Sequence, residues 1–157
     1  MVNVLVVYYT RTGHTEKMAQ IVAEGASEEG AEVALKHIED CSVDELPEYD
    51  AIAIGSPTYY GSMAAAIKKF LDDSVKYHGE LDGMVGAAFS SAANVGGGNE
   101  TTVRGIIDAL LIHGMIIQGD PDGDHYGAVA IGAPDGRANK QCSQLGRRLA
   151  NLTKKLH

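Results

Sequence analysis

The segment VLVVYYTRTGHT, residues 4–15, carries the strongest indication of the fold. Its first part, Val4 to Tyr8, is an unbroken apolar run, which is typical of a strand covered by helices on both faces. Its second part is polar, contains Gly13, and leads into a segment whose apolar residues, starting at Met18, recur at helical spacing. A buried strand, a polar turn and a helix in this order predict the first unit of a parallel α/β sheet.

The same alternation continues through the rest of the chain. Apolar runs predict further strands, over 32–38, 51–54, 85–89 and, in two pieces around a polar insert at 120–125, 115–117 with 128–131. Helical spacing predicts helices over 67–71, 103–111 and 145–156. Strands that alternate with helices indicate a doubly wound parallel sheet, and because no linker is found we expect one domain over residues 1–157. Ligands of such sheets bind at the carboxyl ends of the strands, where the strand order reverses.

Composition excludes several classes of function. Thirteen basic against 21 acidic residues give a net charge of −8, which argues against a nucleic-acid partner. The acidic excess favours either docking on basic protein surfaces or simple solubility. Cys41 and Cys142 predict buried or half-buried thiols rather than a disulfide or a metal site. With no signal peptide and no apolar stretch that could span a bilayer, we expect a cytoplasmic protein without membrane contact.

The loop after the first strand is a candidate phosphate site. It has three Thr hydroxyls, a glycine, and a helix N-terminus with free N–H groups, which together favour an anion. The candidate residues are Thr10, Arg11, Thr12, Gly13, His14 and Thr15. The loop lacks the signatures of triphosphate and dinucleotide sites, so a mononucleotide such as FMN is favoured. The alternative is a plain helix cap at Thr12.

Two further loops could hold a planar ring. After the third strand, two aromatic residues lie beside proline and glycine: Pro57, Thr58, Tyr59, Tyr60 and Gly61. Gly61 could let a peptide reorient and offer its carbonyl to a flavin nitrogen. After the fourth strand, a small and polar run could contact the ring edge: Ser90, Ser91, Ala92, Ala93, Asn94, Val95, Gly96 and Gly97. The alternatives are a plain turn and a flexible glycine loop, and we expect Gly98 or Asn99 to cap the next helix.

These segments resemble the flavodoxin superfamily along essentially the whole chain. Residues 10–15 match its phosphate-loop pattern, Thr/Ser-x-Thr-Gly-x-Thr. The segments 55–63, 97–102, 111–115 and 126–128 look more like the Trp-repressor-binding-protein family of NAD(P)H:quinone oxidoreductases. The resemblance implies a flavodoxin-like, five-stranded sheet of order 2-1-3-4-5 and bound FMN. It also implies that Tyr126 approaches the site.

The chain departs from the quinone oxidoreductases in two ways. Those proteins have longer chains that form tetramers, and they tend to carry a histidine where this chain has Gly96. A monomer or homodimer is therefore expected here. The chain has no Trp, so Tyr59 or Tyr60 would replace the ring-flanking Trp of many flavodoxins.

Three hypotheses follow from the resemblance. The leading one is an electron carrier in which FMN exchanges electrons with partner redox proteins. The runner-up is a reductase that takes hydride from NAD(P)H and reduces a quinone, and the third is a regulatory module without flavin. The sequence shows no hydrolase triad and no metal-ligand spacing. His14 could contact phosphate or face solvent, and His113 is expected at a helix C-terminus, where a positive charge is favourable.

Overall fold

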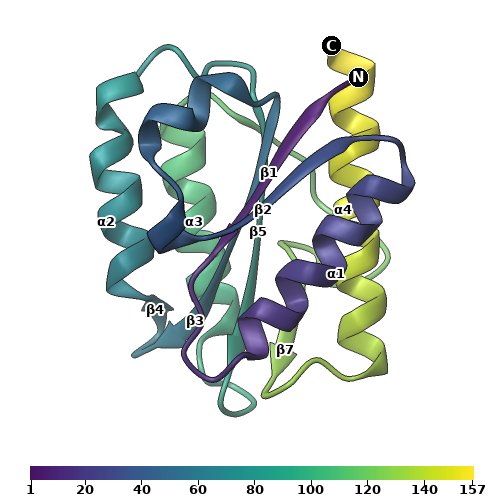
Figure 1. Cartoon of the computed structure of the whole chain (residues 1–157). Coiled ribbons are helices and arrows are strands. Elements are labelled where there is room, and N and C mark those ends of the chain that lie inside the picture. The colour runs from purple at the N-terminus through teal and green to yellow at the C-terminus, as the bar shows by residue number, and fades with distance from the viewer.

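The computed structural model describes residues 1–157 and places one sheet between two layers of helices (Figure 1). The central strands are β1 (Asn3–Tyr8), β3 (Ala51–Tyr59) and β5 (Val85–Ala92), with β2 (Glu32–His37) at one edge. At the other edge lie two short pieces, β6 (Ile116–Ile117) and β7 (Val129–Ile131). The strands run parallel in the order β2-β1-β3-β5-β6, and β7 also pairs with β5.

This order confirms the predicted flavodoxin-like sheet. In chain order, the first four predicted strands are β1, β2, β3 and β5. The fifth is the edge strand formed by β6 and β7. β6 pairs with the start of β5, at Val85 and Gly86, whereas β7 pairs with its end, at residues 90–92. The polar insert between the two pieces therefore interrupts one strand, as its sequence predicted.

Helices cover both faces of the sheet. α1 (His14–Glu28) and α4 (Gly136–Leu156) lie on one face, and α2 (Ala65–Asp73) and α3 (Asn99–Ile112) on the other (Figure 1). Short 3₁₀ turns complete the connections, at Ile38–Asp40, Val43–Glu48 and Ser74–Tyr77. Alternate β1 side chains enter the two cores: Val4 and Val6 face α1 and α4, and Leu5 and Val7 face α2 and α3. The apolar run at the start of the chain is thus buried on both sides, as expected for a central parallel strand.

Two predicted loops begin as strand. β3 continues to Tyr59 and turns back into a two-residue strand, β4 (Ser62–Met63), whereas the sequence predicted its end at Ile54. β5 continues to Ala92 instead of ending at Phe89. The segments are small and polar, so they look like loops, but pairs such as Ser56 with Ser90 and Ser91 with Ala130 extend the ladders. Tertiary pairing overrides the local preference here.

The cysteines are as predicted. Cys142 is fully buried and Cys41 half-buried, and both are free thiols. Burial raises the pKa of Cys142 to about 12 and that of Cys41 to about 11. Both thiols therefore stay protonated and unreactive near neutral pH. None of the helices is long and apolar enough to cross a membrane.

The sequence predicted the position of His113 correctly but its charge wrongly. It follows α3 as expected, but its ring is buried and its Nε2 lies 2.7 Å from Ser74 Oγ. Burial lowers the pKa of His113. The imidazole is consequently neutral near pH 7 and is not the positive charge at the helix end that the sequence suggested.

Candidate functional site

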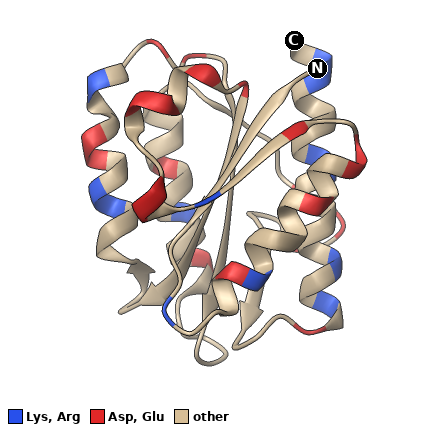
Figure 2. Cartoon of the chain, in the orientation of Figure 1, with Lys and Arg blue, Asp and Glu red and all other residues tan.

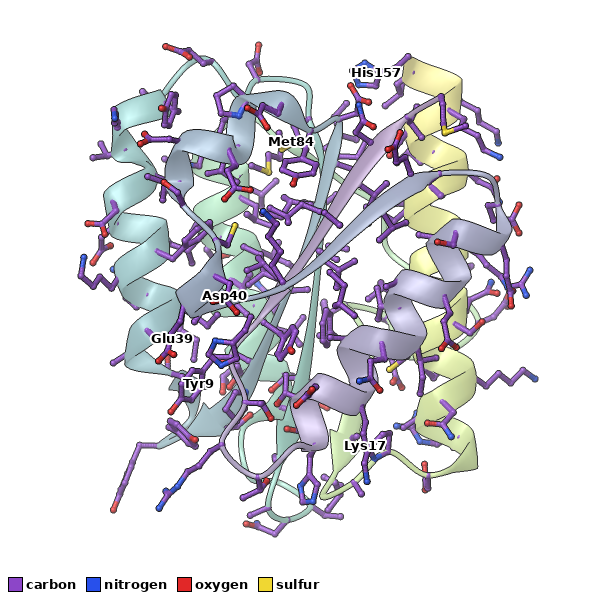
Figure 3. All side chains as sticks on the ribbon, viewed as in Figure 1. Tyr9, Lys17, Glu39, Asp40, Met84 and His157 are labelled. Atoms are coloured by element: carbon purple, nitrogen blue, oxygen red, sulfur yellow. The ribbon has the colours of Figure 1, made fainter.

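A groove of about 500 Å³ runs along the carboxyl ends of β1, β3 and β5. This end is at the bottom of Figure 1, and Figure 3 places Tyr9 and Lys17 towards it and Met84 and His157 at the opposite end. The volume is within the range of sites for cofactors and other small ligands. The position is the one that the strand-order rule predicts.

Eleven of the predicted site residues line this groove. They come from all three predicted loops: Thr10, Arg11, Thr12, His14, Thr15, Pro57, Thr58, Tyr59, Ser91, Ala92 and Ala93. The sequence analysis missed one lining residue, Gly132, which directly follows β7. A signal was available, because a glycine directly after the last predicted strand lies at the same edge of the sheet as the other loops.

The N-terminus of α1 offers free backbone donors to the groove. Its N-cap is Gly13, with a φ of 92°, and no side chain caps the helix. Thr10 Oγ1 instead accepts a hydrogen bond of 3.0 Å from the Gly13 N–H. The alternative prediction of a cap at Thr12 is therefore wrong. The next three N–H groups, of His14, Thr15 and Glu16, have no partner within the helix and carry its positive dipole end, and the Lys17 N–H is the first that donates to a carbonyl of the turn, that of Gly13.

A buried pair of hydroxyls adds another donor. Thr15 Oγ1 and Ser91 Oγ lie 2.9 Å apart, and both residues are almost completely buried at the groove wall. One hydroxyl donates to the other, so the pair has one hydrogen left over. No other acceptor within the chain takes that hydrogen, which is therefore available to a ligand in the groove.

Tyr59 is held at the groove by a row of aromatic rings. Its ring lies 6.4 Å from that of Tyr9, and Tyr9 in turn lies 5.8 Å from the imidazole of His37. The Tyr59 hydroxyl is buried without a hydrogen-bond partner, and burial raises its pKa. An unpaired buried hydroxyl is costly, so this atom is a place where a ligand could supply a missing partner.

The groove contains no carboxylate. Arg11 is the only residue with a permanent charge among those lining it. Most of the acidic ribbon lies on the flanks and at the opposite end of the molecule (Figure 2). The site therefore favours an anion, through Arg11 and the end of α1, although the chain as a whole is acidic.

Other predicted site residues lie outside the lining of the groove. Gly13 forms the turn beneath it, and Ser90 is completely buried behind Thr58. Tyr60 and Gly61 form the tip of the β3–β4 hairpin, where Tyr60 is fully exposed. The stretch from Asn94 to Gly97 extends from the end of β5 as a turn closed by a hydrogen bond of 3.0 Å.

Tyr126 is separate from the groove. Its ring lies over the guanidinium of Arg104 at 5.2 Å, and it lines a smaller pocket of about 170 Å³ between α3 and the polar insert. The insert is fixed to α4 by an ion pair of 2.8 Å between Asp124 and Arg137.

The donor set suits a phosphate attached to a planar ring system. Free N–H groups and hydroxyls gather at α1, whereas Tyr59, Pro57 and the two alanines at the end of β5 give the remaining wall a flatter, less polar surface. Phosphates bind at such helix ends. The residues present therefore fit FMN, with no charged acceptor that would repel its phosphate.

Comparisons with known proteins show the family and the fold of the chain. The family model described as Flavodoxin matches residues 6–112. The chain is 45% identical to a flavodoxin of Aquifex aeolicus, over 96% of this chain and 86% of the relative. It is 38% identical to an NAD(P)H dehydrogenase (quinone) of Sinorhizobium fredii, over 87% of this chain and 86% of the relative. The crystal structure of a flavodoxin, WrbA-like protein from Agrobacterium tumefaciens superposes with a TM-score of 0.86 at 26% identity and covers both chains fully.

Proposed function

The chain belongs to the flavodoxin family and is an FMN-binding electron-transfer protein, and we propose that its FMN binds in the groove at the carboxyl edge of the sheet. The observation that carries this assignment is the uncapped N-terminus of α1 beside the buried Thr15–Ser91 hydroxyl pair. Both features leave donors unsatisfied at one end of the groove, and a phosphate would satisfy them.

Each part of the groove has its own role in this proposal. Residues 10–15 bind the phosphate through backbone N–H groups and hydroxyls. Thr58 and Tyr59 lie along the ring, and residues 91–93 contact its polar edge. FMN supplies the redox chemistry, while the protein positions it, limits its contact with water and sets its potential. The proposal includes partner redox proteins, a monomeric or homodimeric state and a cytoplasmic location.

A carrier is favoured over a reductase because the flavodoxin relative is 45% identical to this chain, whereas the NAD(P)H dehydrogenase (quinone) relative is 38% identical. The reductase is kept as a second candidate because a relative named NAD(P)H dehydrogenase (quinone) is also similar over most of the chain. The two candidates differ in whether the bound flavin accepts hydride from a pyridine nucleotide.

An anaerobic titration separates them. The yellow protein is followed by its absorption spectrum while NADH or NADPH is added, and separately while dithionite is added. A carrier is expected to ignore both nucleotides and to be reduced by dithionite in two separate one-electron steps. Rapid bleaching by a nucleotide, reversed by a quinone, would instead show a reductase. A purified protein that does not bind added FMN, and so shows no flavin absorption, would contradict both candidates.

A further inference from the structure

Three hydroxyl side chains from three elements meet at the groove wall. Thr58 of β3 has its Oγ1 2.9 Å from Ser90 Oγ of β5 and 3.0 Å from Thr102 Oγ1 of α3. Ser90 and Thr102 are both completely buried, whereas Thr58 is half-buried and lines the groove. Thr58 is therefore the one member of the cluster that a ligand can reach.

The distances favour one arrangement of the hydrogens. Ser90 can donate to Thr58 Oγ1 at 2.9 Å or to the Ser91 carbonyl at 3.5 Å, and the shorter bond is stronger. Thr102 donates to Thr58 as well. Both acceptor positions of the Thr58 oxygen are then filled, so its own hydrogen can be donated only into the groove.

A second arrangement is also complete. Thr102 can donate to the Gly98 carbonyl at 2.9 Å instead, and Thr58 can donate to Ser90, which then donates to the Ser91 carbonyl. Each hydrogen keeps an acceptor, and the Thr58 oxygen now presents a lone pair to the groove. The cluster can therefore offer a donor or an acceptor at the same point without leaving a buried hydroxyl unpaired.

We propose that Thr58 contacts the edge of the flavin ring and that Ser90 and Thr102 are positioning residues that let it donate to the oxidised ring and accept from the reduced ring. This inference rests on the proposed function. The flavin nitrogen that is protonated when the ring is reduced is an acceptor in the oxidised ring. It carries an N–H in the reduced ring. The first arrangement matches the oxidised ring and the second the reduced ring. The hydroxyls reverse their direction and keep their protons.

The test measures the dissociation constants of oxidised FMN and of dithionite-reduced FMN for the same variants, without any turnover. Ser90→Ala removes the acceptor that Thr58 needs in the second arrangement, so Thr58 stays a donor. The affinity for reduced FMN is expected to fall about 3- to 10-fold relative to that for oxidised FMN. Thr58→Val should weaken the binding of both forms of FMN. Thr58→Ser, which keeps the hydroxyl, should bind both forms as the wild type does.

Thr153→Val is the matched control. Thr153 is also completely buried in a helix and donates to the carbonyl four residues earlier, at 2.7 Å, but it lies on α4 away from the groove. It should leave the ratio of the two affinities unchanged.

The outcomes separate the two proposals. Two results would overturn the role of the hydroxyl cluster while leaving the FMN site in place. One is a ratio of the affinities for reduced and oxidised FMN that is unchanged in Ser90→Ala, and the other is wild-type affinity for both forms of FMN in Thr58→Val. If Ser90→Ala does not fold, as judged by circular dichroism, the comparison of Thr58→Val with Thr58→Ser decides whether the Thr58 hydroxyl contributes to binding of the two forms of FMN. Wild-type protein that binds neither form of FMN would overturn both the proposed function and this inference.

Discussion

At the scale of single residues, the groove depends on small polar side chains rather than on charges. Thr15 and Ser91 are nearly buried, yet they keep one hydrogen free for a ligand, and Thr58 is oriented by two hydroxyls behind it. Buried hydroxyls have few alternative partners, so their neighbours limit the directions in which they can donate. Substituting one of them should therefore change binding more than substituting an exposed residue of the same loop.

The phosphate assignment is tested by Thr15→Val. The variant keeps the shape of the side chain but removes the hydroxyl pair with Ser91. Hydrogen bonds to a charged group contribute about 1.5–3 kcal/mol, so we expect FMN to bind at least tenfold more weakly, as measured by fluorescence titration. Riboflavin, which lacks the phosphate, is the control ligand and should lose little affinity. Equal losses for both flavins would contradict the assignment.

His113 makes stability depend on pH. Its folded-state pKa lies below the ordinary value of 6.5 because the ring is buried. Between these two pKa values the unfolded chain binds a proton that the folded chain does not, so the free energy of unfolding rises with pH through this range. Urea unfolding between about pH 5 and pH 8 should show this loss of stability at the acidic end. His113→Gln should reduce the slope of the free energy of unfolding against pH. A slope identical to that of the wild type would show that other groups cause the pH dependence.

At the scale of elements, backbone positions that only certain residues tolerate hold the site together. The hairpin between β3 and β4 turns through Tyr60 and Gly61, with φ values of 50° and 77°. Thr101 Oγ1 donates to the Gly61 carbonyl at 2.6 Å and thereby ties the hairpin to the start of α3. This carbonyl already has a partner, so any reorientation of the turn towards a flavin has to break that bond.

Tyr60 is a strained position in this turn. Positive φ at both central residues favours Asn-Gly, whereas a tyrosine there costs about 1 kcal/mol. Tyr60→Asn should therefore raise the free energy of urea unfolding by about that amount. Tyr60→Phe keeps the strain and serves as the control. Lower stability in Tyr60→Asn would mean that the exposed ring itself stabilises the hairpin.

α1 and α4 pack too closely for a side chain at Gly146. A Cβ there would lie 2.0 Å from the Val22 carbonyl oxygen. Gly146→Ala should force the helices apart and cost about 1–3 kcal/mol of stability. Gly136→Ala, in the first turn of the same helix, is the control because a Cβ there meets nothing within 4 Å. Equal thermal midpoints for the two variants would show that the helices can separate at little cost.

At the scale of the whole molecule, the acidic residues that give the chain its net charge lie apart from the groove that would bind the cofactor. The net charge is −8, yet no carboxylate lines the groove, and most acidic residues lie on the flanks and at the opposite end of the molecule (Figure 2). Coulomb effects across water fall off quickly with distance. The acidic excess should therefore have little influence on the potential of a bound flavin, and Arg11 should have more.

The size of the assembly tests the expectation of a monomer or homodimer. One chain has a mass of 16.6 kDa. Light scattering behind size-exclusion chromatography should give that mass or twice that value. A tetramer would contradict the expectation and would strengthen the reductase hypothesis, because the expectation rests on the differences between this chain and the tetrameric quinone oxidoreductases that it resembles.

Local sequence patterns were enough to predict the fold class and the three loops that meet at the carboxyl edge, whereas the strand order was predicted from the resemblance to flavodoxins. Periodicity and turn residues are local properties, and the parallel βαβ rule then leaves few arrangements of the strands. The predicted positions of β1 and the split edge strand are confirmed for this reason.

Which residues of those loops line the groove, and which hydroxyls meet, depends on the packing of the folded chain. Ser90 lies behind Thr58, Tyr126 lies beside Arg104, and Gly132 joins the groove, because strand pairing brings together residues that are distant in sequence. His113 is neutral for the same reason, since burial depends on the packing of α3 against the turn after α2. Contacts of this kind depend on the whole fold, and no local pattern encodes them.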